Sequence, residues 1–166
     1  MRSDYNTNIG SRDGLSLEQV ESKLNTNVSL AGDGNMPEGY SLNEKGYLLG
    51  RRGSVGGVTT GQYPGGFTNR ASGSKIYMAP AVKGFDLDTR NGIFKHEFIH
   101  AWHLTIMPNN AAYRMYSERA AATFSNDYHE IYKMGQFLTN FKIYMGSYPS
   151  KYSYGNFSKL IPLWIK

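Results

Sequence analysis

The sequence predicts an α+β fold, because its β-favouring segments and most of its helical segments occupy different parts of the chain. Short runs with β-branched or aromatic residues, bounded by glycine, proline or asparagine, occur before residue 80. Helical spacing of apolar residues, with capping residues in front of it, dominates after residue 86. The chain has 166 residues, enough for one hydrophobic core and too few for two comfortable ones. We therefore expect a single domain over residues 1–166.

The N-terminal segment combines an expected flexible lead-in with a short helix. Residues 1–14 are polar and loop-like, so we expect no regular structure there. Ser16 followed by Gln19 is a capping-box pattern, in which each side chain satisfies a backbone N–H group of the other residue. Apolar residues then recur at helical spacing, which predicts a helix over about residues 16–26.

Several short segments of the first half are expected to be strands. Residues 40–42 and 47–49 flank an Asn-Glu-Lys-Gly turn, which predicts a hairpin. The expected strands cover residues 28–31, 40–42, 47–49 and 75–79. Residues 50–74 are instead rich in glycine and poor in aliphatic side chains. We expect a long Gly-rich loop there, or a pair of weak strands, and such loops often form lids or binding edges.

The second half of the chain predicts three helices. Polar residues that can cap a helix, Asp86 to Thr89 and Asn109-Asn110, stand in front of the first two. Pro108 ends the first helix. The expected helices cover about residues 89–105, 111–125 and 127–145. The aromatic tail from residue 146 contains two prolines, and we expect it to pack as an irregular cover.

Composition excludes several classes of function. The chain has no cysteine, so disulfides, thiol catalysis and zinc-thiolate sites are excluded. The net charge of +5 would suit an acidic partner, but the basic residues are scattered, with Arg51-Arg52 the only adjacent pair. This scatter, without a recognition motif, disfavours a nucleic-acid partner. No apolar run reaches the length of about 18 residues that a membrane span requires.

The segment His96-Glu97-Phe98-Ile99-His100 carries the strongest chemical signal. Histidines four residues apart lie on one face of a helix, where both imidazoles can bind one metal ion. Glu97 reaches the space in front of that ion, where it can accept a proton from metal-bound water and pass it to a leaving amine. The segment also follows an expected strand, and an edge strand in such an arrangement can line a substrate cleft.

A catalytic zinc site needs a third protein ligand, and Glu118 is the expected one. It lies 18 residues after His100, among alanines that would let its helix approach the motif helix closely. His103 is the rival, but it lies seven residues after His96, about 10 Å further along the axis. We expect His103 to support the ligands or to line the cleft. His129 becomes a further alternative if the chain breaks near residue 125.

The reaction also needs a donor for the developing oxyanion. The sequence does not choose among the residues with suitable side chains. They are Tyr113, Arg119, Tyr128 and His129.

The motif HEFIH, together with a downstream glutamate in SERAAATF, resembles the gluzincin branch of the zincin metallopeptidases. The resemblance covers residues from about 75 to 128. It implies Zn²⁺ as the cofactor, with His96, His100 and Glu118 as ligands and Glu97 as general base. It also implies a small mixed β-sheet whose edge strand runs near the active-site helix.

The chain departs from the gluzincin pattern at Ala122, where many members place an acidic residue that orients a histidine. The partner that a metal-bound histidine needs must then come from elsewhere, and we expect Asp86, Asp88 or a backbone carbonyl. The metzincin pattern HExxHxxGxxH is absent. This absence disfavours the metzincin branch.

The expected function is the hydrolysis of peptide bonds through zinc-bound water, with a peptide or protein as substrate. Such compact domains also resemble toxin or effector modules carried by larger secreted proteins, so a parent chain or an inhibitor protein is a further expected partner. A cytosolic processing or regulatory peptidase is the alternative with the same chemistry, and the sequence does not otherwise assign a location. The alternative is a catalytically silent, metal-stabilised domain that binds protein or glycan. Glu97 disfavours this alternative, because a structural site needs no base.

Overall fold

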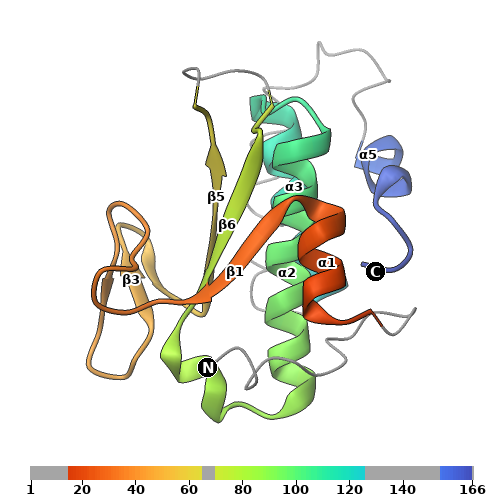
Figure 1. Cartoon of the computed structure of the whole chain (residues 1–166). Helices are drawn as coiled ribbons and strands as arrows, with labels where there is room; N and C mark the ends of the chain where they lie inside the picture. Colours follow the sequence, from red (N-terminus) through yellow and green to blue (C-terminus); the bar gives the residue numbers. More distant parts are fainter. Residues whose placement is uncertain (1–14, 65–69, 126–153, 166) are drawn as a thin grey trace.

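Two three-stranded β-sheets and four α-helices make up the part of the chain that the computed structural model describes, residues 15–64, 70–125 and 154–165. The helices stand on one side of the first sheet, and the second, smaller sheet lies on the other side (Figure 1). The predicted α+β class is therefore confirmed. None of the helices in these ranges is long and apolar enough to cross a membrane.

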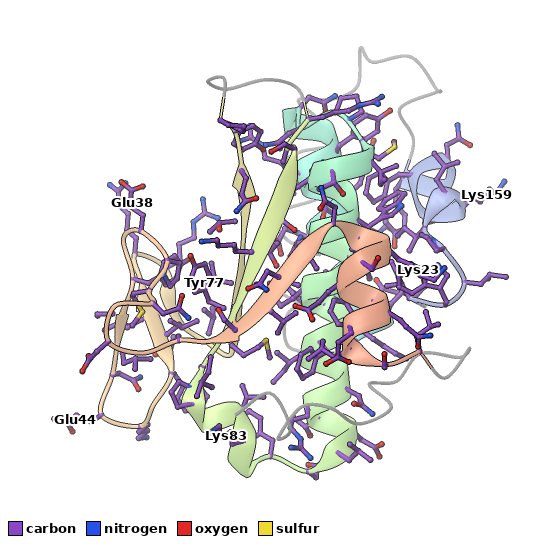
Figure 2. The ribbon with its side chains drawn as sticks, in the orientation of Figure 1. Lys23, Glu38, Glu44, Tyr77, Lys83 and Lys159 are labelled. Carbon is purple, nitrogen blue, oxygen red and sulfur yellow. The ribbon has the colours of Figure 1, made fainter. Side chains whose placement is uncertain are left out.

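The first sheet is mixed, as predicted. Its strand order is β1-β6-β5, with β1 parallel and β5 antiparallel to the central strand β6. The three strands are β1 (Thr26–Leu30), β6 (Gly73–Met78) and β5 (Gly57–Gln62). Val28, Ile76 and Thr59 are register partners and therefore share the face of the sheet toward the helices. Tyr77 points to the opposite face, toward the second sheet (Figure 2).

The second sheet is an antiparallel meander that contains the predicted hairpin. Its strands are β2 (Ser41–Leu42), β3 (Leu48–Gly50) and β4 (Gly53–Val55). In the turn between β2 and β3, the Asn43 side chain accepts hydrogen bonds from the N–H groups of Lys45 and Tyr47. Leu48 is fully buried and joins this sheet to the main core.

Of the two alternatives predicted for residues 50–74, the described part of that segment shows the pair of weak strands and not the long Gly-rich loop. This part holds β4, β5 and the first residues of β6. The strand that directly precedes the motif helix, β6, is central, and β5 from this segment is the edge strand beside that helix. The signal was weak because only Val58, Thr59 and Thr60 of β5 favour a strand, while the rest of β5 is glycine and glutamine.

The helices begin at the expected capping residues. The side chains of Ser16 and Gln19 form the predicted capping box of α1 (Leu17–Leu24). The side chain of Asp86 caps α2 (Leu87–Ile106), and that of Asn110 caps α3 (Ala111–Phe124). A short 3-10 helix, η2 (Pro80–Gly84), connects β6 to α2.

The C-terminal residues differ from the irregular cover that the prolines predicted. Residues 154–165 contain the helix α5 (Tyr154–Leu160), which packs against α3. Phe157, Ile161 and Ile165 on this segment are buried in the same core as the sheet. Lys23 of α1 lies beside this segment, 5.9 Å from the Trp164 ring (Figure 2). The expected lead-in at 1–14 and the expected helix at 127–145 lie outside the described residues.

We expect Phe157→Ala to destabilise the protein by about 3–5 kcal/mol, because it leaves a cavity among aromatic rings. Phe157 is 1% exposed, and its ring lies 5.4 Å from the Trp102 ring and 5.7 Å from the Tyr113 ring. Leu160→Ala on the same helix is the matched control, since Leu160 is 59% exposed. Urea denaturation of both variants measures the difference, and equal losses would contradict the packing described for α5.

Candidate metal centre

The two motif histidines lie on one face in the middle of α2. Their Nε2 atoms are 3.1 Å apart, and their ring centroids are separated by 4.8 Å. Both side chains are mostly buried, with 20% of His96 and 16% of His100 exposed. At this distance one ring can donate an N–H proton to the lone pair of the other, or both lone pairs can face a shared metal ion.

Glu118 on α3 reaches the same place. Its Oε1 lies 3.3 Å from His100 Nε2, and its Oε2 lies 4.0 Å from His96 Nε2. The predicted close approach of the helices makes this possible. The side chains of Ala120, Ala121 and Ala122 are at most 1% exposed, and α2 and α3 pack closely along their length.

The three side chains could hold a metal ion. One ligand atom from each of His96, His100 and Glu118 lies within 4.8 Å of the others. In a tetrahedral site with bonds of about 2.0–2.1 Å, neighbouring ligand atoms are about 3.3 Å apart. The separation of 3.1 Å between the two histidine Nε2 atoms is close to this value. The distances to Glu118 involve different oxygens, with Oε1 3.3 Å from His100 Nε2 and Oε2 4.0 Å from His96 Nε2, so the carboxylate would have to turn to present one oxygen to a bound ion.

Ser117 supplies the partner of a ligand histidine that the sequence did not identify. Its Oγ lies 2.8 Å from His100 Nδ1, so His100 can donate through Nδ1 while Nε2 faces the metal position. The expected partners Asp86 and Asp88 are wrong. Asp86 accepts two hydrogen bonds from Thr89 at the start of α2, and Asp88 is exposed in the first turn, two turns before His96.

Glu97 is buried against the edge strand, beside the metal position and outside the ligand group. It is 5% exposed, and its Oε2 accepts a hydrogen bond of 2.6 Å from the Thr59 hydroxyl. Burial raises the pKa of Glu97 to about 8, the Thr59 hydrogen bond opposes this shift, and the charge of Glu118 adds to it. Gly57 leaves room for the carboxyl group, because a Cβ atom there would lie 2.9–3.1 Å from Glu97 side-chain atoms.

The remaining pKa shifts at this position concern His100 and Glu118. Burial lowers the pKa of His100 to about 4, so its imidazole is neutral and can act as a ligand at neutral pH. Burial also raises the pKa of Glu118, while the charges of His96 and Arg52 lower it. The Glu118 side chain is nevertheless 48% exposed, so water and ions can reach it.

His103 does not join the ligand group, and at 2% exposure it does not line an open cleft. Its ring lies 6.0 Å from the Phe157 ring, on the side of α2 that faces the core. Within the described ranges, its Nε2 atom has no hydrogen-bond partner. His103 is therefore a core residue behind the metal position.

The two expected oxyanion donors within the described residues both pack against α5. Tyr113 stacks on Phe157, with ring centroids 5.7 Å apart, and Arg119 lies over the Tyr154 ring at 3.8 Å. Both side chains take part in the packing of α5. Tyr128 and His129 lie outside the described residues.

Comparison of the chain with protein-family models, with curated proteins and with solved structures gives no match. The function must therefore be argued from the geometry of His96, Glu97, His100 and Glu118.

We expect Ser117→Ala to weaken Zn²⁺ binding about 10–100-fold, because His100 loses the hydroxyl that fixes its ring. Ser125→Ala is the matched control on the same helix, since the Ser125 hydroxyl only bonds the Ala122 carbonyl. Competition with a chromophoric chelator measures both affinities. Equal affinities of the two variants would show that Ser117 does not support the site.

We expect the stability of the metal-free protein to fall with acid, in part through His103. Burial, with the charges of His100 and Arg114, lowers the pKa of His103 from 6.5 to about 4. Between these values the unfolded chain binds a proton that the folded chain does not, so the free energy of unfolding decreases as pH falls.

His103→Asn removes this titration. The slope of unfolding free energy against pH should then be less steep by about 1.4 kcal/mol per pH unit between about pH 4 and 6.5. Urea denaturation of parent and variant in the presence of a chelator measures both slopes. Other titrating groups cancel in the comparison, so identical slopes would contradict a depressed pKa for His103.

Proposed function

We propose that this protein is a zinc-dependent peptidase of the zincin type, in which His96, His100 and Glu118 hold the metal and Glu97 is the general base. The observation that carries the proposal is that the two acidic side chains, Glu118 and Glu97, take different positions. Glu118 lies 3.3 Å from His100 Nε2 as a third ligand, while the neighbouring Glu97 is turned toward Thr59. A purely structural metal site has no use for this second, buried carboxyl group.

The donor set suits zinc. Two neutral imidazoles and one carboxylate are ligands of catalytic Zn²⁺ sites, which keep a fourth position for water. When bound, Zn²⁺ lowers the pKa of that water toward about 7, which makes a hydroxide nucleophile available. Because the Glu118 side chain is 48% exposed, solvent and a substrate could reach an ion held by these residues.

Glu97 has the position and the environment of a general base. It follows His96 directly on α2, and its carboxyl group is shielded from bulk water by β5. Positive charge placed beside it lowers its pKa from the value of about 8 that burial imposes, so its ionised form becomes available. It then accepts the proton of the attacking water and delivers it to the leaving amine.

A peptide is the substrate class that the surroundings favour. β5 pairs with β6 on one side, and within the described ranges no strand pairs with its other edge. An extended peptide can add to such an edge through main-chain hydrogen bonds. Because β5 also contacts α2, a peptide bound there would pass the metal position.

Glu97→Gln tests the proposal, since the amide keeps the size of the side chain but accepts no proton. We expect peptide hydrolysis by the zinc-loaded variant to fall about 10²–10⁴-fold, with zinc content unchanged. A quenched-fluorescence peptide library measures hydrolysis, and metal analysis measures zinc. Glu44→Gln, an exposed change on the β2–β3 turn, is the control and should retain full activity.

Two outcomes would contradict the proposal. A Glu97→Gln variant that binds zinc and cleaves peptides as well as the parent would remove Glu97 from the mechanism. A zinc-loaded parent that cleaves no member of the library would leave the metal-stabilised binding domain as the better interpretation.

A further inference from the structure

The side of β5 that faces α2 carries one side chain between two glycines. Alternation along the strand places Gly57, Thr59 and Gly61 on this side, and Val58 and Thr60 on the other. A Cβ atom at Gly57 would lie 2.9 Å from Glu97 Cγ, and one at Gly61 would lie 2.9 Å from the Tyr63 ring. Thr59 is thus the only residue of this side of β5 with a side chain to offer to α2.

Both hydrogen-bond contacts of the Thr59 hydroxyl are with oxygen atoms of Glu97. The hydroxyl lies 2.6 Å from Glu97 Oε2 and 3.3 Å from the Glu97 backbone carbonyl oxygen. A hydroxyl has a single proton, which goes to the nearer carboxyl oxygen. The two residues are 38 positions apart in the sequence, so this contact ties the edge strand to the helix at the residue proposed as the base.

Such a bond matters for proton transfer more than for folding. A glutamate side chain has three rotatable bonds, and a base must hold its accepting oxygen within about 3 Å of the proton it takes. A hydrogen bond to one carboxylate oxygen fixes the plane of the group and leaves the second oxygen for the proton. Gly57 leaves the space in which the fixed carboxyl group fits.

We propose that Thr59 is a positioning residue for Glu97, whose hydroxyl aligns the general base for proton transfer from the attacking water. The inference rests on the proposed peptidase function and adds to it a residue outside the motif helix. Thr59 acts through Glu97 and has no contact with the metal ligands in this role.

Thr59→Val tests the role of the hydroxyl, because valine keeps the branched shape and the preference for a strand. For folded, zinc-loaded protein we expect kcat to fall about 10- to 100-fold, the range for a lost hydrogen bond to a charged group. KM and zinc affinity should change less than about twofold, since neither the peptide edge nor the ligands are altered. Thr59→Ser, which keeps the hydroxyl, should restore kcat to within about threefold of the parent.

Thr60→Val is the matched control, because it makes the same substitution one residue along β5 on the opposite side. It should leave kcat unchanged. A Thr59→Val variant with the kcat of Thr60→Val would overturn the inference. So would a Thr59→Ser variant as slow as Thr59→Val, because the branched shape and not the hydroxyl would then matter.

The activity of the parent protein tests the proposed function separately from the role of Thr59. A zinc-loaded parent without peptide hydrolysis overturns both proposals, whereas an active parent with an unaffected Thr59→Val variant overturns only the role of Thr59. The active parent is therefore the first measurement of the series.

Discussion

The packing of α3 on α2 is the contact on which the candidate metal centre depends. The alanines at 120–122 of α3 are buried, and the two helices pack closely enough for Glu118 to lie 3.3 Å from His100 and for Ser117 to reach the other ring nitrogen of the same imidazole. Gly92 of α2 allows a close approach to the C-terminal end of α3, since a Cβ atom there would lie 3.0 Å from the Ser125 carbonyl oxygen. A bulkier contact at either place would separate the third ligand from the first two. The C-terminal helix α5 packs on α3 and, through Phe157, on Trp102 of α2. It therefore stabilises the packing of α2 against α3.

The same packing creates an electrostatic conflict that a cation resolves. Glu97 is buried beside Glu118, and the repulsion adds to the burial that raises the pKa of Glu97. Burial also disfavours the charged form of His100, which lowers the pKa of that imidazole and keeps it neutral. A divalent ion among these groups would attract both carboxylates and use the neutral imidazole as a ligand. Metal binding to this arrangement would therefore also stabilise the fold, because the unfolded chain does not present the three ligands together.

The sequence predicted the features that depend on neighbours in the chain. The capping box of Ser16 and Gln19, the caps at Asp86 and Asn110, and the histidines four residues apart all follow from local spacing. Glu118 required a further step, from alanines to close helix packing, and the structure brings it to the histidines. Ser117 and Thr59 could not be predicted, because a single hydroxyl residue has no local pattern and its partner lies 17 or 38 residues away. The buried position of His103 was missed for a similar reason, since it depends on α5.

The sequence predicted β5 only as one of two alternatives, and the reason for this weak signal is also what makes the strand useful. A strand is identified in a sequence by bulky β-branched and aromatic residues, but bulk on the side of β5 that faces α2 would collide with Glu97 and with the Tyr63 ring. The segment therefore reads Gly-Val-Thr-Thr-Gly, which has little tendency to form a strand by itself, and its pairing with β6 supplies the stability. In β5, residues with a strong preference for strands are replaced by glycine where the proposed site needs space, and by one threonine where it needs a hydroxyl group. A weak strand pattern next to a strong helical motif is then itself informative, because it indicates where the helix must be approached closely.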